Sequence, residues 1–260
     1  MPSLEPLTTR LGNEFATNVL PDERPAAWMS DEIRAAIKSG WRETYSLLFD
    51  KPHRPLVGVL AWHHRQLIKW HWVSRHRICL GRVVRFLAYF SIWSRGHMKS
   101  TIAKRIAIVD AVLSVHYNLG GYCLYVSGTD EKTEKHSISI EKLLQDCVRP
   151  HVPALAEVNK SKEGGRTLGW KATFFYTRAG YVFHFGSLQS GLAGGNVDDI
   201  RPTLLIPDDI DDRKDSPVIS EKNFNLLTSE ILPMGAKGTL TLWAQNLISR
   251  YSSMYRIHKG

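Results

Sequence analysis

The sequence has few cysteines and no long apolar run. Its three cysteines, Cys79, Cys123 and Cys147, lie far apart and form no C-x-x-C pair, so their spacing predicts neither a disulfide framework nor a zinc site. No run approaches the roughly eighteen apolar residues that span a bilayer, and the first residues, MPSLEPLTTRLGNEF, lack the apolar centre of a signal peptide. We therefore expect a cytoplasmic protein in a reducing compartment, without a membrane partner.

Acidic residues are scarce relative to basic ones. The chain carries 34 Lys and Arg against 25 Asp and Glu, a net charge of +9. This excess favours a polyanionic partner, although a merely soluble basic protein has the same composition. With 260 residues, 43% of them hydrophobic, the chain can bury the core of one large α/β domain, alone or with a small appendage.

The most specific pattern lies in residues 86–109, FLAYFSIWSRGHMKSTIAKRIAIV. A short apolar run leads into a polar turn ending in Lys99, Ser100 and Thr101, and an apolar helix follows. This order is typical of a P-loop, in which backbone N–H groups and a helix N-terminus face phosphates and the lysine reaches the outer phosphates. The usual spacing has glycines where this chain has Trp93 and Met98, so Lys99 with Ser100 or Thr101 carries the match.

Around this unit the patterns alternate between helix and strand, which indicates a mainly parallel sheet. Prolines punctuate residues 1–55, where we expect a lead-in with one helix over about 30–47. The expected helices after it cover 56–78, the central helix to about 117, then 131–148 and a helix from 217. The expected strands cover 122–126, a hairpin of 171–177 with 181–186, 203–206 and 239–244. Residues 159–168 and the glycine-rich stretch after 186 are expected to be loops.

The segment 56–78 is rich in His, Trp and Arg. We expect a basic amphipathic helix that packs through Trp62, Leu67, Trp70 and Val73, with its basic side solvated or touching a nucleotide or a nucleic-acid backbone. In the helix 131–148 the expected apolar positions are Ile138, Ile140, Leu143, Leu144 and Cys147. The four histidines His63, His64, His71 and His76 have no Cys or acidic residue beside them, so a metal site is the weaker interpretation.

Acidic residues follow the predicted strand 203–206. Asp208, Asp209 and Asp211 stand at its carboxyl end, where an open parallel sheet places its ligand crevice. In a P-loop enzyme the first acid holds Mg²⁺ through water and a neighbouring acid orients the attacking water; alternatively, the acidic loop caps the next helix. The last predicted strand ends in Gln245 and Asn246, polar groups delivered to the same edge.

Five segments in order, WHHRQLIKWHW, SRGHMKSTIAKR, CLYVSGTDEKTEKH, RPTLLIPDDIDD and GTLTLWAQNLISRYSSMYR, resemble the motifs of the ATPase domain of bacteriophage large terminase subunits. The resemblance covers roughly residues 56–260. It implies an α/β P-loop NTPase of the additional-strand (RecA-like, ASCE) type, with a central, mainly parallel sheet flanked by helices. Residues 1–55 would be a helical N-terminal lead-in and residues 56–260 the ATPase domain.

The resemblance also implies an activity and partners. A protein of this kind hydrolyses ATP with Mg²⁺ to move double-stranded DNA into a procapsid. Its partners are the portal ring, the small terminase subunit and further copies of itself in a homo-oligomeric ring, while the isolated domain is a monomer. No nuclease domain follows the last motif, so we expect no DNA cleavage by this chain.

Residue roles carry over from the matching motifs. The phosphate loop would comprise Ser94, Arg95, Gly96, His97, Met98, Lys99, Ser100 and Thr101. An arginine four places before the lysine is typical of the family, and Arg95 matches it. Ser100 and Asp208 would hold Mg²⁺, and Asn246 would belong to a coupling motif continued by residues 247–255.

Three assignments stay open at this point. Asp209 is the expected catalytic acid, but the family has Glu there, and Asp211 is the alternative base. Arg201 is either a finger that reaches a neighbouring subunit's nucleotide or a partner of the acidic cluster. Met98 replaces the glycine before the lysine, which leaves a catalytically silent DNA-binding or assembly subunit as an alternative, beside another helicase-like P-loop translocase.

Overall fold

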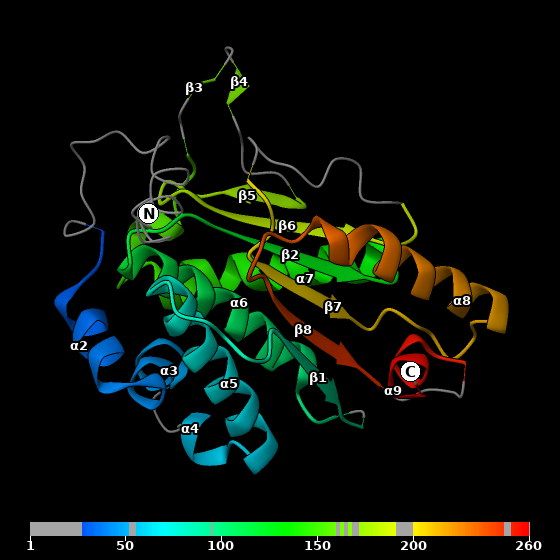
Figure 1. Ribbon diagram of the computed structural model, residues 1–260. Coiled ribbons are helices and arrows are strands. Elements are labelled where there is room, and N and C mark those ends of the chain that lie inside the picture. Colours follow the sequence, from blue (N-terminus) through cyan, green and yellow to red (C-terminus); the bar gives the residue numbers. More distant parts are fainter. Residues whose placement is uncertain are drawn as a thin grey trace, which may run out of the picture.

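The computed structural model describes residues 28–51, 56–94, 96–159, 162–163, 166–167, 172–190, 200–246 and 251–259 (Figure 1). The helices are α2 (Asp31–Ser39), α3 (Trp41–Phe49), α4 (Leu56–Val59), α5 (Trp62–Cys79), α6 (Lys99–His116), α7 (Asp130–Leu143), α8 (Pro217–Leu226) and α9 (Ser253–Lys259). The strands are β1 (Ala88–Ile92), β2 (Gly121–Ser127), β3 (Lys162–Glu163), β4 (Arg166–Thr167), β5 (Phe174–Tyr176), β6 (Tyr181–Ser187), β7 (Leu204–Asp208) and β8 (Leu240–Gln245). Short π and 3₁₀ turns add η2 (Leu144–Val148), η3 (Pro153–Leu155), η4 (Leu227–Ile231) and η5 (Leu232–Met234).

A six-stranded sheet in the order β1-β8-β7-β2-β6-β5 forms the centre of the fold (Figure 1). Five strands are parallel, and β5 joins β6 antiparallel at one edge. The expected α/β fold with a mainly parallel, helix-flanked sheet is therefore confirmed. The strand before the Lys99 loop, β1, is separated from the strand before the acidic residues, β7, by β8 alone.

The two faces of the sheet bury different side chains because successive residues of a strand point to opposite sides. In β2, Cys123 and Tyr125 join the larger core, to which α2, α3, α5 and α6 contribute. Tyr122, Leu124 and Val126 face the opposite side, together with residues of η4 and α9. The resulting three-layer arrangement buries β2 completely, as expected for a central parallel strand.

The region predicted as one helix over 30–47 contains two. Ser30 caps α2 through its side-chain oxygen, which accepts from the Ile33 N–H, and Gly40 separates α2 from α3 with φ of 129°. Glycine is the residue that adopts this backbone conformation at low cost. The prediction of one helix was wrong because it gave too little weight to this glycine.

The packed side of α5 also differs from the prediction. Leu67 is buried and Trp70 is half-buried, but the side chains of Trp62 and Val73 are 74% and 45% exposed. His71 and Arg75 are buried in their place and contact Asp110 of α6. The basic side of this helix was expected to be solvated or to touch a nucleotide or a nucleic-acid backbone, whereas Arg75 forms an internal ion pair with Asp110.

Asp110 is the centre of this buried polar group. One of its carboxylate oxygens lies 2.9 Å from His71 Nε2 and 3.2 Å from Arg75 Nε, and the other accepts the Tyr181 hydroxyl at 2.8 Å. Arg75 also donates to Ser114 Oγ at 2.6 Å. Burial is the largest influence and acts to raise the pKa of Asp110, but the charge of Arg75 and the contacts with His71 and Tyr181 together outweigh it, so the pKa is lowered. The group connects α5, α6 and β6.

Several boundaries were refined. β7 extends to Asp208, so the first acidic residue belongs to the strand. The helix after β2 ends at Leu143 and continues as the π turn η2, and Ile138, expected to be apolar core, is 57% exposed. Within the predicted loop 159–168, β3 and β4 pair antiparallel.

Among the described residues, no helix has the length and apolar character to cross a membrane.

Candidate functional site

The carboxyl ends of β1, β7 and β8 bring the predicted site residues to one edge of the sheet. The segment after β1 leads into α6 at Lys99, β7 ends in Asp208, and Asn246 follows β8 directly. Because these strands are parallel and adjacent, residues more than a hundred positions apart in the chain come into contact here. This is the edge at which open α/β sheets bind ligands.

Lys99 is the first residue of α6 and its side chain is turned inward. The residue is only 7% exposed. Its ammonium group donates hydrogen bonds to the carbonyl oxygens of Trp93 at 2.6 Å and Ser94 at 3.1 Å, and to Asn246 Oδ1 at 2.6 Å. These hydrogen bonds of Lys99 therefore connect the loop before α6 to the end of β8.

Asn246 connects the lysine to the acidic loop. Its side-chain oxygen accepts from Lys99, and its side-chain N–H group donates to Asp209 Oδ1 at 3.0 Å. Asp209 has a φ of 47°, in the left-handed region that Asp tolerates better than most residues. Its backbone N–H donates to the Ala244 carbonyl at 3.0 Å. A cation, an amide and a carboxylate thus form one continuous chain of hydrogen bonds.

Asp208 lies on the buried side of the same edge. Its carboxylate accepts hydrogen bonds from Ser100 Oγ at 3.1 Å and from the Tyr125 hydroxyl at 2.5 Å. His136 Nε2 lies 3.6 Å from the oxygen that Tyr125 contacts. The pKa of Asp208 is raised to about 6, mainly by burial and also by the charge of Asp209, although the hydrogen bonds from Tyr125 and Ser100 act in the opposite direction.

Tyr125 and His136 were not predicted as site residues. Burial raises the pKa of the Tyr125 hydroxyl and, with the charges of Lys104 and Lys132, lowers the pKa of His136 to about 4. His136 is therefore a neutral neighbour of Asp208 at ordinary pH. Tyr125 could have been found from the alternation of β2, but the contact of His136 with Asp208 depends on how α7 packs.

The loop before α6 has an unusual backbone. Gly96 has a φ of 81° and Met98 a φ of 56°, both in the left-handed region. Glycine adopts this region freely, whereas a residue with a Cβ pays strain of about 1 kcal/mol there. Met98 thus has a backbone conformation that glycine, the residue of the P-loop pattern at this position, adopts at lower cost.

Histidines from α5 contact this loop. His64 Nδ1 accepts the Ala61 N–H at 3.2 Å, so its Nε2 carries the proton and donates to the His97 carbonyl at 2.9 Å. His97 Nδ1 lies 2.6 Å from Ser94 Oγ. The rings of His63 and His64 pack edge-on against Trp93, with centroids 4.5 and 5.1 Å away. These contacts hold the loop against the start of α5.

Asp211 has a different role from the alternative base considered above. Its buried carboxylate accepts the Ser253 N–H at 2.8 Å, the Ser253 hydroxyl at 3.0 Å and the Gln245 amide at 3.4 Å. Burial raises its pKa, and the bonds from Ser253 oppose the shift. Asp211 therefore caps the start of α9. The alternative expectation that the acidic loop caps the next helix is not met by Asp211, because the next helix, α8, is capped by Ser216.

The structure describes the position of Arg201 but not that of Arg95. Arg201 is exposed before the amino end of β7. Asp208 lies at the other end of β7, and the described contacts include no ion pair between Arg201 and the acidic residues, so the structure does not support their pairing. Arg95 lies outside the described residues, as do residues 247–250 of the predicted coupling segment. Ser253 to Lys259 of that region form α9.

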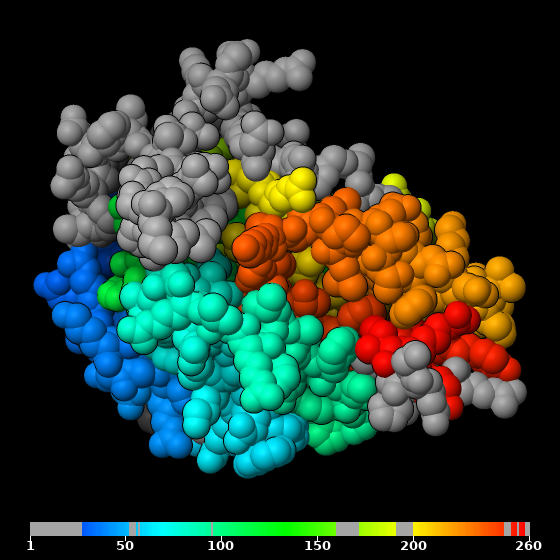
Figure 2. Space-filling view, in the orientation of Figure 1, coloured from blue at the N-terminus to red at the C-terminus, as the bar shows by residue number. Residues whose placement is uncertain are grey.

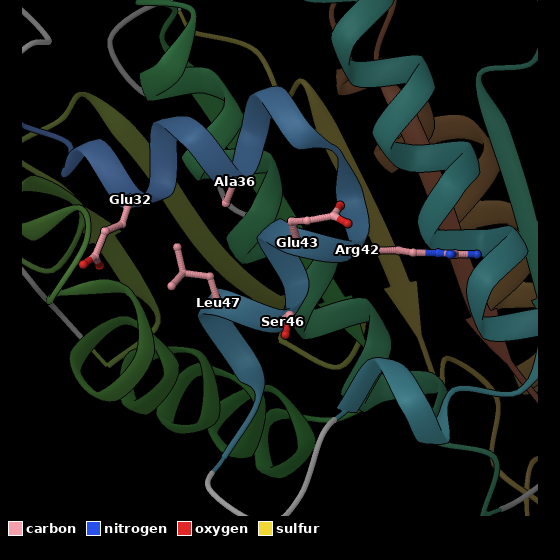
Figure 3. Close-up of a pocket in the computed structure, with 6 residues that line it drawn as sticks. All are labelled: Glu32, Ala36, Arg42, Glu43, Ser46 and Leu47. Carbon is pink, nitrogen blue, oxygen red and sulfur yellow. The ribbon is translucent and has the colours of Figure 1, made fainter.

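A cavity of about 660 Å³ lies elsewhere, between α2 and α3 (Figure 3). Its lining comprises Glu32, Ala36, Arg42, Glu43, Ser46 and Leu47. Figure 3 shows the side chain of Arg42 extending away from the other five. The cavity contains none of the predicted site residues, and its mixed charges favour no particular ligand. The carboxyl edge of the sheet is therefore the stronger candidate site.

The donor set at this edge fits Mg²⁺ better than a transition metal. Over the described parts of the chain, no group of three or more His, Cys, Asp or Glu side chains is arranged to hold a metal. Mg²⁺ does not need such a group, because it is held by one or two protein oxygens together with water and substrate phosphates. The neighbouring Ser100 hydroxyl and Asp208 carboxylate are oxygen ligands of this kind.

Comparison with protein-family models finds no match, and no curated protein matches significantly.

Proposed function

We propose that this chain is the ATPase motor domain of a DNA-packaging terminase, a P-loop NTPase of the additional-strand type that hydrolyses ATP to move double-stranded DNA into a procapsid. The observation that carries the proposal is the pair of contacts Ser100–Asp208 and Lys99–Asn246–Asp209 at one sheet edge. These residues were selected from the sequence by their places in separate motifs. Their meeting is what an ATP site built from those motifs requires.

The strand order supports the same class of fold. In an additional-strand P-loop protein, a further strand lies between the one that precedes the phosphate loop and the one that ends in the acidic residues. Here β8 lies between β1 and β7 and delivers Asn246 to the site. The order β1-β8-β7-β2 agrees with this arrangement, and the lead-in helices α2 and α3 pack into the core on the α6 side.

Each residue has a role that follows from its position. Lys99, at the N-terminus of α6, neutralises phosphate charge at a helix end that already favours anions. Ser100 and Asp208 would hold Mg²⁺, which supplies positive charge to the phosphate oxygens. The side chain of Asp209 is half-buried, and among the described contacts its carboxylate accepts one hydrogen bond, from Asn246 to Oδ1, which suits it to orient a water. Asn246 is hydrogen-bonded to both Lys99 and Asp209, so a change at either residue would act on it.

The test is ATP hydrolysis by the purified chain with Mg²⁺, with and without double-stranded DNA, beside Lys99→Ala and Asp209→Ala. We expect turnover to fall at least a hundredfold in both variants, because removal of one preorganised electrostatic group costs on the order of 10²–10³ in rate. Lys142→Ala is the control, since Lys142 is an exposed lysine near the end of α7 and contacts none of the candidate site residues in the described part of the chain. Turnover that persists in Lys99→Ala would refute the assignment.

A catalytically silent P-loop subunit is the second candidate, because Met98 has a left-handed backbone conformation although it carries a Cβ. In that case the wild-type chain binds ATP without hydrolysing it, and Met98→Gly restores turnover. An active wild-type chain excludes this candidate. A helicase-like translocase shares the same chemistry and is distinguished by translocation that needs no portal ring or procapsid.

A further inference from the structure

The positive charge of the chain is concentrated in one segment. Between Asp50 and Asp110 the sequence has no Asp or Glu, but it has twelve Lys and Arg. The rest of the chain has 22 Lys and Arg against 25 Asp and Glu. The net charge of +9 is therefore not a general property of the surface, and it originates in the part of the chain that contains α5 and the connection from α5 to β1.

Some of these cations are used inside the protein. Arg75 pairs with Asp110, and Lys99 is bound in the candidate site. Lys104 and Arg105 are partly buried in α6, and burial lowers the pKa of both. Arg105 also lies over the ring of Phe49, 5.4 Å from its centroid. These four residues account for the internal share of the charge among the described cations. Of the other eight, Lys51 precedes α4, two lie outside the described residues, and five lie on α5 or in the connection to β1.

Five cations on the outside have no acidic partner among the residues that the structure describes. They are Arg65, Lys69 and Arg77 on α5, and Arg82 and Arg85 in the connection to β1, and all five are exposed. We call them the α5 basic surface. A run of unpaired like charges repels itself, so it lowers stability unless a partner of opposite charge binds there.

The α5 basic surface is one continuous feature. On α5, residues 65, 69, 73 and 77 recur every four positions and form a stripe about 18 Å long, since a helix rises 1.5 Å per residue. Arg77 Nε donates to the Val83 carbonyl at 3.0 Å and Trp70 Nε1 to the Phe86 carbonyl at 3.1 Å. These two bonds attach the connection to α5. In Figure 2, the cyan and blue-green segments that contain α5 and the connection lie together on the face toward the viewer.

Large apolar side chains accompany the cations. Val83 is 84% exposed and Phe86 64% exposed, and Arg85 lies over the Phe86 ring with 5.2 Å to its centroid. A surface on which exposed apolar side chains lie between cations fits a partner in which charged groups alternate with less polar groups. The sugar-phosphate backbone of a nucleic acid has this character.

We propose that the α5 basic surface is where the protein grips duplex DNA, through the phosphate backbone and without reading sequence. Duplex DNA carries one negative charge per about 1.7 Å of its axis, so a stripe of about 18 Å faces several phosphates at once. Contacts to the phosphate backbone carry no sequence information, so binding through this surface would not depend on the base sequence. The inference rests on the proposed function only for the choice of duplex DNA as the polyanion.

The surface is also well placed to report on the candidate site. His63 and His64 at the start of α5 contact Trp93 and the loop before Lys99. The same helix therefore carries part of the α5 basic surface and contacts the phosphate loop. DNA bound along α5 would act on that loop directly, which predicts that DNA stimulates ATP hydrolysis through this helix.

The experiment measures binding of a short fluorescein-labelled DNA duplex of random sequence by anisotropy, without ATP, over a series of salt concentrations. The variants are Arg82→Gln with Arg85→Gln, and separately Arg65→Gln with Lys69→Gln. Each pair should weaken binding roughly tenfold at moderate salt and reduce the slope of log K against log salt by about 1.8, or 0.9 per lost phosphate contact. The matched control, Lys222→Gln with Lys237→Gln, removes two exposed cations elsewhere and should bind almost as the wild type.

Either outcome is separable from the ATPase test. Because no residue of the α5 basic surface belongs to the candidate site, basal ATP hydrolysis should be unchanged in both pairs while its stimulation by DNA is lost. If the wild type proves inactive but the pairs still weaken DNA binding, only the proposed function fails. Binding by both pairs equal to that of the control overturns the inference. Tighter wild-type binding to polyglutamate or to phosphatidylserine vesicles than to DNA also overturns it.

Discussion

Asp208 gives the sharpest stability prediction, because its carboxylate is fully buried and its pKa is raised to about 6 from an ordinary 3.8. A pKa above the unfolded value means that the folded state prefers the protonated acid. The folded protein therefore pays a penalty for ionisation that is absent below about pH 3.8 and complete above about pH 6. A difference of about two pKa units corresponds to about 3 kcal/mol.

Asp208→Asn removes this penalty while keeping the shape of the side chain. We expect the variant to be more stable than the wild type by about 3 kcal/mol at pH 8 and by about half as much at pH 5, because linkage integrates between the two pKa values. The amide also changes the hydrogen bonds with Ser100 and Tyr125. That contribution does not depend on pH, so the change in the gain between pH 5 and pH 8, on the order of 1 kcal/mol, isolates the carboxylate.

The assay is urea unfolding of both proteins at pH 5 and pH 8 in the presence of EDTA, so that no divalent cation pairs with the acid. Asp146→Asn, which replaces an exposed carboxylate, is the control and should show little difference between the two pH values. A gain for Asp208→Asn that is equal at both pH values, or larger at pH 5, would refute the reasoning. The same variant should lose Mg²⁺-dependent ATP hydrolysis, so stability and activity should move in opposite directions.

Two further predictions concern the surroundings of the site. Asp110→Ala should destabilise the fold by about 3–5 kcal/mol, since it leaves Arg75 buried without its partner; adding Arg75→Met should recover a large part of this loss in urea unfolding, and no recovery would contradict the ion-pair account. Met98→Gly should leave stability within about 1 kcal/mol, as relief of left-handed strain offsets the added flexibility of the unfolded chain; a large loss would show that the Met98 side chain packs in a way its exposure does not suggest.

The parallel sheet was predictable from local patterns, because each strand of the core is a short apolar run followed by a polar turn. The central helix was predicted to reach about residue 117 and ends at His116, since Asn118, Gly120 and Gly121 stop it. The order of strands was not predictable in this way. That β8 inserts between β1 and β7 depends on pairings between residues over a hundred positions apart, and turn chemistry does not encode them.

The face of a helix was harder to predict than its existence. In α5, aromatic residues alternate with basic ones, so apolar periodicity alone does not determine which side is buried. Trp62 was assigned to the core because it is large and apolar, while the basic residues as a group were expected to be solvated or to touch a nucleotide or a nucleic-acid backbone. The missing signal was Asp110, an acid inside the apolar helix 102–115, which must find a buried cation.

The two adjacent aspartates acquire different chemistry from the geometry of one strand. Leu204, Ile206 and Asp208 point to the same side of β7, toward the larger core, so Asp208 inherits the burial of its strand neighbours. Asp209 comes after the last strand residue, in a left-handed conformation that turns it out of the alternation and toward Asn246. One acid is thereby held beside Ser100 in an apolar environment, and the other reaches the chain of hydrogen bonds that ends at Lys99. A site with this division needs no third acid, which is why Asp211 is available to fix α9 and why Asp209→Glu, not a change at Asp211, is the substitution that tests how far the second carboxylate must reach.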